Sequence, residues 1–338
     1  MTNFSKQAHQ IKKEIVSAKN ILLHLHPGPD GDSVGSVLAT YHALKQLGKK
    51  VSIISGDSPP PDFLSHLPGF KHIKFQNFFQ TELEYFDLFI ILDSADLKFI
   101  SDQGTVVFPP HLKTINIDHH STNPSYANLN LIDPNSPATC QILYALFIKW
   151  DIAIDQKIAA CLLTGLYTDT AFKYDYTNWQ TFDIAAKLAK FYPRFPALFS
   201  KVDNSNTAQT IKLAGLLLSS VHSYLNNHLA IASVSASELK QNKLSKSDSK
   251  GLDATNLLKS VSAWYIAVTL FEIQPKLVKA SFRTNLPHKY NLAKIAAAVG
   301  DGGGHPAAAG STLKLSLSQA QKVIINTVSR LYPQIEKS

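Results

Sequence analysis

Short apolar runs alternate with amphipathic stretches through the first half of the chain, and this alternation restricts the fold more than any other feature. The runs are rich in Ile and Leu and are flanked by Gly, Pro or Asp, as buried strands usually are. The predicted strands are residues 20–26, 50–56, 87–93 and 113–118. Between the first two, residues 33–50 place apolar side chains at helical spacing, with Gly48 near the end. Such alternation predicts an α/β fold with a mostly parallel sheet and helices on both faces.

The chain of 338 residues is long enough for two domains, each with its own core. The remaining predicted elements are helices at 136–150, 155–170, within 180–227 and at 291–299, strands at 228–236, 263–273 and 276–284, a glycine-rich loop at 300–310, a short strand and a C-terminal helix. Two prolines in 192–200 interrupt the helical pattern and mark the best boundary. We therefore expect an N-terminal domain over 1–190, a linker over 191–210 and a smaller C-terminal α/β domain over 211–338, with a cleft between the domains.

The composition excludes two broad classes of protein. With 45% hydrophobic and 17% charged residues the chain is not disordered, and no apolar run reaches the roughly 18 residues of a membrane span. The N-terminus is a mixed polar helix without the apolar region of a signal peptide, so we expect a cytoplasmic protein. The two cysteines, Cys140 and Cys161, lie within apolar helical patterns, where a buried thiol is commoner than a ligand or a disulfide.

The net charge of +8 is unevenly distributed along the chain. Residues 1–200 hold 17 Lys and Arg against 18 Asp and Glu, whereas residues 201–338 hold 16 against 7. One interpretation of this excess is a solvated, lysine-rich surface. The other is a half of the protein that attracts a polyanion toward a site held by the other half.

Acidic and histidine residues follow the predicted strands at the point where each strand ends. "HPGPDGD" (26–32) follows the first strand, "DSAD" (93–96) closes the third and "DHH" (118–120) closes the fourth. A later helix ends beside another aspartate, Asp169. Because ligands bind beyond the carboxyl ends of parallel strands, these clusters should present metal-type ligands to one edge of the sheet.

The candidate metal ligands are His26, Asp30, Asp32, Asp93, His119 and Asp169. Imidazoles with several carboxylates and no thiolate suit Mn²⁺, with Mg²⁺, Fe²⁺ or Co²⁺ as alternatives, better than structural zinc. Six candidates are too many for one catalytic ion that keeps a water, and about right for two. In a two-metal site a bridging hydroxide attacks phosphorus while both cations offset the charge on the phosphoryl oxygens. The set therefore predicts hydrolysis of a phosphate ester or anhydride.

Each cluster also has a purely structural explanation. Asp30 opens a loop before a helix, and such an aspartate is more often a cap or turn former. Four clusters at the carboxyl side of predicted strands or helices are hard to explain as independent caps, because unpaired carboxylates at this density would repel one another. His24 precedes the loop and is ambiguous, and Asp96 and Asp133 have no predicted role.

The segment "GDGGGH" (300–305) follows a predicted helix in the C-terminal half. Consecutive glycines let backbone N–H groups approach an anion closely, and His305 adds a donor. A flexible glycine turn is an equally good account of this segment alone. Arg283, in "SFRT" on a nearby predicted strand, favours a phosphate pocket because Arg offers two parallel N–H groups to phosphate.

Taken in order, the motifs "HLHPGPDGDSVGS", "ILDSAD", "NIDHH", "GLYTDT", "SFRT" and "GGGHPAAAG" resemble the DHH phosphoesterase superfamily over nearly the whole chain. The similar branch is the bacterial nano-RNase and pAp-phosphatase group, which has a DHH-associated C-terminal domain. The resemblance implies a two-Mn²⁺ hydrolase whose N-terminal domain binds the metals and whose C-terminal domain binds the nucleotide. It implies one ion held by His26, Asp30 and Asp93, and a second held by Asp32, Asp93, His119 and Asp169.

The resemblance also implies roles for residues that hold no metal tightly. His120 would face the scissile phosphate, and Asp118 would orient its neighbours. The far phosphate or nucleotide would contact Arg283, Gly303, Gly304 and His305. One position departs from the family, which usually has a glycine where this chain has Asp301. A negative charge beside a proposed anion pocket puts the seat of the substrate in question unless that side chain points outward.

The function expected from this resemblance is hydrolysis of short RNA oligonucleotides to mononucleotides. 3′-Phosphoadenosine 5′-phosphate (pAp) and the dinucleotide pApA are further expected substrates, both giving AMP. The alternatives are a cyclic-dinucleotide phosphodiesterase of the same superfamily and a non-catalytic nucleotide sensor. A sensor is disfavoured because every expected ligand position is filled, and an exopolyphosphatase is disfavoured because we do not expect "GGGH" in one.

Overall fold

The structure, a computed structural model, describes residues 3–173, 177–245, 248 and 254–336. The chain divides into two compact units, Met1–Asn204 and Ser205–Ser338. The division lies inside the range 191–210 that the sequence predicts as a linker, but much of that range is helical. Helix α6 (Phe195–Asp203) closes the first unit, and α7 (Ala208–Ser219) opens the second.

The first unit contains a six-stranded sheet with strand order β3-β2-β1-β4-β5-β6, and every strand pairs in parallel with its neighbours. The strands are β1 (Asn20–His24), β2 (Lys50–Ile54), β3 (Ile73–Lys74), β4 (Leu88–Leu92), β5 (Lys113–Asp118) and β6 (Leu129–Ile132). Four of them correspond to predicted strands, with β1 and β2 ending two residues earlier. The two edge strands, β3 and β6, are not predicted because such short segments carry too few residues to show a pattern.

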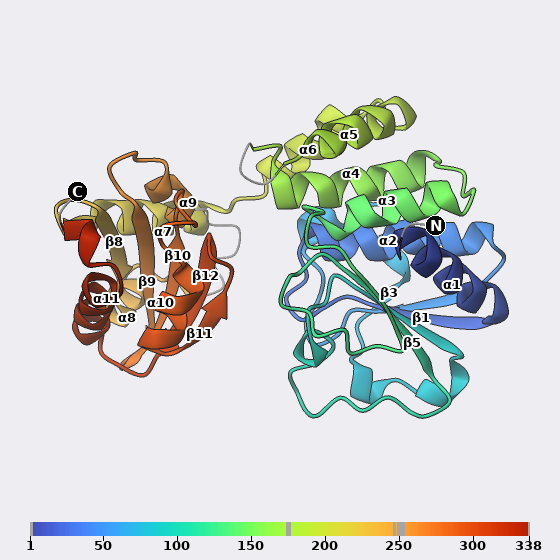
Figure 1. Ribbon diagram of the computed structural model, residues 1–338, viewed down its shortest axis with the longest axis horizontal. Helices are drawn as coiled ribbons and strands as arrows, with labels where there is room; N and C mark the ends of the chain where they lie inside the picture. Colours follow the sequence, from blue (N-terminus) through green and yellow to red (C-terminus); the bar gives the residue numbers. More distant parts are fainter. Residues whose placement is uncertain (1–2, 174–176, 246–247, 249–253, 337–338) are drawn as a thin grey trace. The chain divides into compact units, whose positions relative to one another are not determined.

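The two faces of this sheet are covered differently. The helices α1 (Asn3–Ser17), α2 (Gly31–Gln46), α3 (Thr139–Lys149) and α4 (Gln156–Thr170) share one core with alternate residues of the strands (Figure 1). Helix α5 (Trp179–Phe191) packs on α4 as a further layer. The opposite face packs Leu22 and Phe89 against Phe78 and Ile100. It is covered by 3₁₀ helices and loops, where the sequence predicts helices on both faces. The 3₁₀ helices of this unit are η1 (Asp62–Leu64), η2 (Phe70–His72), η3 (Phe78–Gln80), η4 (Leu83–Tyr85) and η5 (Leu97–Phe99).

The second unit contains a mixed six-stranded sheet with strand order β11-β12-β10-β9-β8-β7. Its strands are β7 (His222–Tyr224), β8 (Leu229–Val234), β9 (Ile266–Gln274), β10 (Leu277–Arg283), β11 (Asp301–Gly304) and β12 (Ala308–Leu313). Its other helices are α8 (Ala236–Gln241), α9 (Ala254–Lys259), α10 (Leu292–Val299), α11 (Leu317–Leu331) and η7 (Pro333–Glu336). Helices α10 and α11 share one core with the sheet, and α7, α8 and α9 share the other. Within the described ranges, none of the helices has the length and apolar character needed to cross a membrane.

The prediction of a loop over residues 300–310 is wrong in part. Asp301–Gly304 forms the edge strand β11, which pairs with β12. Glycine lacks the side chains by which a strand is recognised in a sequence. Here the glycines allow close approach: a Cβ at Gly302 would lie 2.5 Å from the carbonyl oxygen of Gly310. Gly304 has a φ of 134°, which other residues rarely adopt.

Candidate metal centre

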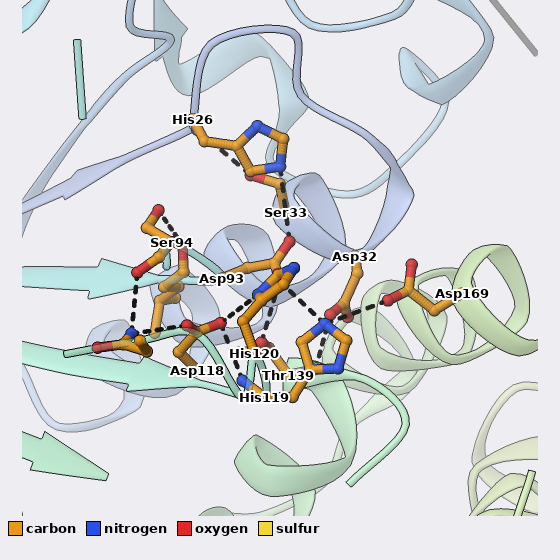
Figure 2. Close-up of polar contacts among 12 residues, drawn as sticks. His26, Asp32, Ser33, Asp93, Ser94, Asp118, His119, His120, Thr139 and Asp169 are labelled. Atoms are coloured by element: carbon orange, nitrogen blue, oxygen red, sulfur yellow. Dashed lines mark hydrogen bonds and ion pairs between the residues drawn. The ribbon is translucent and has the colours of Figure 1, made fainter. Parts of the chain in front are cut away.

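The predicted ligands of the first unit converge at the carboxyl edge of the parallel sheet (Figure 2). Strands β1, β4 and β5 are neighbours, so the residues that follow them meet: His26, Asp93 and His119. The start of α2 contributes Asp32, and the end of α4 contributes Asp169. The sheet topology therefore brings together residues separated by more than a hundred positions.

The described residues contain three groups of potential ligands, and within each group the ligand atoms lie within 4.8 Å of one another. The groups are His26 with Asp30 and Asp93, Asp32 with His119 and Asp169, and Asp93 with His119 and His120. The first group has the same members as the first ion site that the family resemblance implies. The second contains three of the four ligands implied for the other ion, and its His119 lies beside Asp93, the fourth.

Asp93 lies at the centre of the cluster, with only 2% of its surface exposed. One carboxylate oxygen, Oδ2, lies 3.6 Å from His26 Nε2. The other, Oδ1, lies 3.5 Å from His119 Nε2 and accepts a hydrogen bond from Thr139 Oγ1 at 3.2 Å. Its φ of 52° is in the left-handed region, a strained conformation that usually persists only where the surroundings enforce it. The two halves of the cluster thus share one buried carboxylate.

Asp30 and Asp32 have different surroundings although they are two residues apart. Asp30 is the N-cap of α2, and its Oδ1 accepts hydrogen bonds from the backbone N–H groups of Asp32 at 3.1 Å and Ser33 at 3.0 Å. The same Oδ1 lies 3.8 Å from His26 Nε2, so the cap and the ligand interpretations both describe this residue. Asp32 is fully buried and accepts backbone hydrogen bonds from Thr139 at 2.6 Å and Cys140 at 3.0 Å.

The N-terminus of α3 is a part of the centre that the sequence did not predict. Its backbone N–H groups neutralise part of the Asp32 charge, as helix N-termini commonly do for anions. Glycines in α2 and α4 make room for this arrangement. A Cβ at Gly165 would lie 2.5 Å from Asp32 Oδ1, and a Cβ at Gly35 would lie 2.5 Å from the carbonyl oxygen of Cys161 in α4. Backbone donors carry no side-chain signal, so no local sequence pattern could have revealed them.

The "DHH" triplet divides into three different environments. Asp118 is fully buried, and its Oδ1 accepts hydrogen bonds from the backbone N–H of His119 at 2.9 Å and from His120 Nδ1 at 2.7 Å. The ring of His120 lies against that of His119, with 4.4 Å between centroids, and its Nδ1 lies 3.8 Å from Asp93 Oδ1. Burial alone would lower the pKa of His120, but Asp118 raises it. Asp118 therefore fixes the orientation of the second histidine.

Burial and mutual repulsion raise the pKa of two carboxyl groups. Burial, followed by the charge of Asp93, raises the pKa of Asp32 to about 7. Burial with the charge of Asp32 raises the pKa of Asp169 well above its ordinary value. Burial alone would also raise the pKa of Asp93, but hydrogen bonds from His119 and His26 lower it far below the usual range. Buried carboxylates that oppose one another's ionisation are stabilised by a divalent cation, so this donor set fits one.

The pKa values of His26 and His119 are also raised above the ordinary value for histidine. Burial alone would lower the pKa of His26, but the carboxylates of Asp30 and Asp93 raise it to about 10. In the same way Asp93 and Asp32 outweigh burial and raise the pKa of His119 to about 9. A metal ligand must be the neutral imidazole, so a cation held by these histidines would release protons on binding and would bind more tightly as pH rises.

His24, which the sequence left ambiguous, is not a ligand in any of the three groups. It is fully buried at the end of β1, with Nε2 3.1 Å from the carbonyl oxygen of Phe99 and its ring edge against Phe89. Phe99 in turn has its ring beside His26 and His120. The other two unassigned residues form turns. Asp96 accepts from the backbone N–H of Lys98, and Asp133 accepts from the backbone N–H of Asn135 and from Ser136 Oγ.

The predicted substrate residues of the second unit lie at one end of adjacent antiparallel strands. Arg283 is paired with Ala308 of β12, and Gly304 of β11 is paired with the next residue, Ala309. His305 begins the turn that joins β11 to β12. Asp301, the departure from the family pattern, is exposed and lies three residues before Gly304 on the edge strand.

Comparison with known proteins agrees with this architecture. Residues 20–166 match the family described as DHH family, N-terminal domain. The chain is 31% identical over 319 residues to the bifunctional oligoribonuclease and PAP phosphatase NrnA of Thermus thermophilus, which covers 91% of this chain and 89% of that protein. It is 24% identical to the Bacillus subtilis protein of the same name, over 90% of this chain and 92% of that one. A crystal structure of an exopolyphosphatase-related protein from Bacteroides fragilis superimposes with a TM-score of 0.86 at 26% identity, over 98% of each chain. The chain therefore belongs to the DHH family.

Proposed function

We propose that this chain is a metal-dependent phosphoesterase that hydrolyses short oligoribonucleotides to mononucleotides and converts pAp and pApA to AMP. The observation that carries the proposal is the buried carboxylate of Asp93, whose two oxygens face two separate groups of ligand atoms. The substrate class is supported by the similarity, over nine tenths of the chain, to proteins named oligoribonuclease and PAP phosphatase.

In this proposal His26, Asp30 and Asp93 hold one divalent cation, and Asp32, Asp93, His119 and Asp169 hold the other. We favour Mn²⁺, since mixed imidazole and carboxylate donors without thiolate suit it. When bound, two such cations activate water and stabilise charge on a phosphoryl group. The residues of this chain fix the spacing, because Asp93 is shared and Asp32 is held by the N-terminus of α3.

His120 is the residue that we propose to contact the scissile phosphate. Its Nδ1 donates to Asp118, which directs the opposite edge of the ring away from that carboxylate. Asp118 raises the pKa of His120, and in this proposal the ring offers its other nitrogen to a phosphoryl oxygen. Asp118 acts through His120 and is a positioning residue.

We propose that the second unit binds the far phosphate or the nucleotide through Arg283, Gly303, Gly304 and His305. These residues lie at the same end of β10 and β11, the two strands that flank β12. The excess of basic residues after position 200 favours an anionic ligand. The exposed position of Asp301 is compatible with this role, since a solvated carboxylate repels a neighbouring anion weakly.

Initial rates on a panel of substrates test the proposal. The panel is pAp, pApA, RNA of two to five nucleotides, a long RNA, polyphosphate and cyclic di-AMP, each with Mn²⁺ and with chelator. We expect Mn²⁺-dependent release of mononucleotides, fastest from the short RNAs. Faster turnover of cyclic di-AMP or polyphosphate would overturn the assigned substrate, and nucleotide binding without product would identify a sensor instead.

The variant Asp93→Asn tests the shared carboxylate. It should lose activity by orders of magnitude because both ion sites lose a charged ligand. Asp96→Asn is the matched control: Asp96 lies three residues further along the same turn, and an asparagine can still accept from the backbone of Lys98. Near-normal turnover in Asp93→Asn, or an equal loss in Asp96→Asn, would count against the two-ion arrangement.

A further inference from the structure

The carbonyl oxygen of Ser94 contacts three side chains that do not belong to the ligand groups. It accepts hydrogen bonds from Tyr126 Oη at 3.0 Å and from Asn116 Nδ2 at 3.3 Å, and Asn123 Nδ2 lies 3.2 Å away. Ser94 directly follows Asp93 (Figure 2). The contacts to its carbonyl oxygen therefore hold the turn that carries the shared carboxylate. We call Asn116, Asn123 and Tyr126 the Ser94 clamp.

Asn123 connects this turn to the "DHH" segment. Its Nδ2 has two hydrogens, and its two shortest contacts are Asn116 Oδ1 at 2.6 Å and Asp118 Oδ2 at 2.7 Å. Its Oδ1 accepts from the backbone N–H of Ser125 at 2.8 Å, which fixes the orientation of the amide. Asn123 therefore binds the oxygen of Asp118 that does not bind His120.

The clamp joins the ends of two adjacent strands. Asn116, in β5, donates to the carbonyl oxygens of Ile91 in β4 and of Ser94 in the turn beyond it. Asp93 needs such support because its backbone is in the strained left-handed region, with a φ of 52°. Without Asn123, one oxygen of a fully buried carboxylate would lose the only side-chain donor that the described residues give it.

We propose that Asn123 is a positioning residue for the reaction: it fixes Asp118, and thereby His120, relative to the turn that carries Asp93. The inference rests on the proposed function only for its effect on turnover. Its structural content is that Asp93, after β4, and His120, after β5, are kept in one mutual geometry by a side-chain amide that contacts neither side chain. Partners of this kind, bound to groups that themselves contact the centre, typically affect activity or metal affinity 10–100-fold.

The test compares Asn123→Ala with Asn130→Ala in the full chain loaded with Mn²⁺. Asn130 is a matched control because it holds the same loop, donating to the carbonyl oxygens of Ser125 and Ala127, whereas its side chain makes no hydrogen bond to Asp118 within the described residues. We expect kcat on a short RNA to fall about 10–100-fold in Asn123→Ala with KM changed little, and both parameters to stay near wild type in Asn130→Ala. Equal losses in both variants would reduce Asn123 to a loop-stabilising residue and overturn the proposal.

A second readout does not depend on turnover. The electron paramagnetic resonance spectrum of bound Mn²⁺ reports the geometry of its ligands, so it should change in Asn123→Ala and not in Asn130→Ala. If the wild-type chain turns over none of the substrates, the proposed function fails while the spectra still test the clamp. If Asn123→Ala does not fold, Tyr126→Phe removes one bond to Ser94 with little change of volume, and should lower kcat several-fold. Wild-type kcat and spectrum in the folded variant would overturn the clamp.

Discussion

At the scale of single residues, Asp30 combines two roles that are usually considered alternatives. Its Oδ1 caps the first turn of α2 and lies near His26, while 57% of the side chain remains exposed. A cap needs only an oxygen acceptor, whereas a cation ligand of this kind benefits from the full negative charge. The two roles can therefore be separated by substitution.

Asp30→Asn should leave the free energy of unfolding in chelator nearly unchanged, because asparagine caps helices as well as aspartate does. Asp30→Ala should lower that free energy by about 1 kcal/mol through loss of the cap. Both variants should bind Mn²⁺ more weakly by a similar factor. Urea titration and equilibrium dialysis measure the two quantities, and wild-type Mn²⁺ affinity in Asp30→Asn would leave this residue a cap alone.

His24 makes a pH-dependent contribution to stability. Burial lowers its pKa to about 4, against the carbonyl of Phe99, which raises it. The unfolded chain, with an ordinary value of 6.5, therefore takes up the proton first as pH falls. The stabilisation is complete above about pH 6.5 and is lost as pH falls toward 4, an effect of about 3 kcal/mol.

The variant His24→Gln cannot titrate in this range. Its free energy of unfolding should fall less than that of the wild type between pH 7 and pH 4, and the two curves should converge at low pH. The exposed histidine His222 provides the control, since His222→Gln should keep the wild-type slope. Parallel curves for wild type and His24→Gln would contradict a neutral, buried His24.

At the scale of secondary-structure elements, the contact between α2 and α4 decides the shape of the centre. Gly35 and Gly165 let the two helices approach, and a Cβ at Gly165 would meet Cys140 Sγ at 2.3 Å and Asp32 Oδ1 at 2.5 Å. An isolated helix would gain up to about 1 kcal/mol from alanine in place of glycine. Here the clash with buried atoms should outweigh that gain.

Gly165→Ala should therefore lower the free energy of unfolding by roughly 1–3 kcal/mol and weaken Mn²⁺ binding by displacing Asp32. Gly215→Ala, in α7, is the opposite case, because no heavy atom lies within 4 Å of its Cβ position. It should raise that free energy by about 0.5–1 kcal/mol. Urea titrations of both variants give the comparison, and a stabilised Gly165→Ala would refute the close packing of α2 on α4.

The elements also show what sequence alone could predict. The ends of β1, β4 and β5 could be located because each apolar run stops at a cluster of Asp or His, and parallel topology then requires those clusters to meet. The edge strands β3 and β6 could not be located, because strands of two and four residues are too short to show an alternating pattern. Strand β11 was missed because glycine carries no side-chain pattern. The donors at the start of α3 and the bonds of Asn123 depend on tertiary geometry, for which no local signal exists.

At the scale of the whole molecule, each unit has cores of its own. The clusters of the first unit end at Leu198, and those of the second begin at Leu213. We therefore expect residues 1–204, expressed alone, to unfold cooperatively and to bind Mn²⁺ about as tightly as the full chain. The fragment should lose most of its kcat/KM on short RNA, because it lacks Arg283 and the β11–β12 hairpin, which we propose to bind the nucleotide.

Calorimetry, equilibrium dialysis and initial rates on the fragment test this division of roles. Adding residues 205–338 as a separate chain is a useful control, since partial recovery would show that the second unit acts by binding substrate. A fragment that retains the full kcat/KM would place substrate recognition wholly in the first unit.

The position of the centre along the chain has a consequence for how the protein is made. Every ligand candidate from His26 to Asp169 precedes Asn204, the last residue of the first unit. Domains emerge from the ribosome N-terminal end first and generally fold as units. If the proposed ligands are correct, a nascent chain can close its metal centre while the second unit is still being synthesised. On that proposal a message truncated after residue 204 would still encode a chain that takes up metal, whereas one that ends before α4 would lack Asp169.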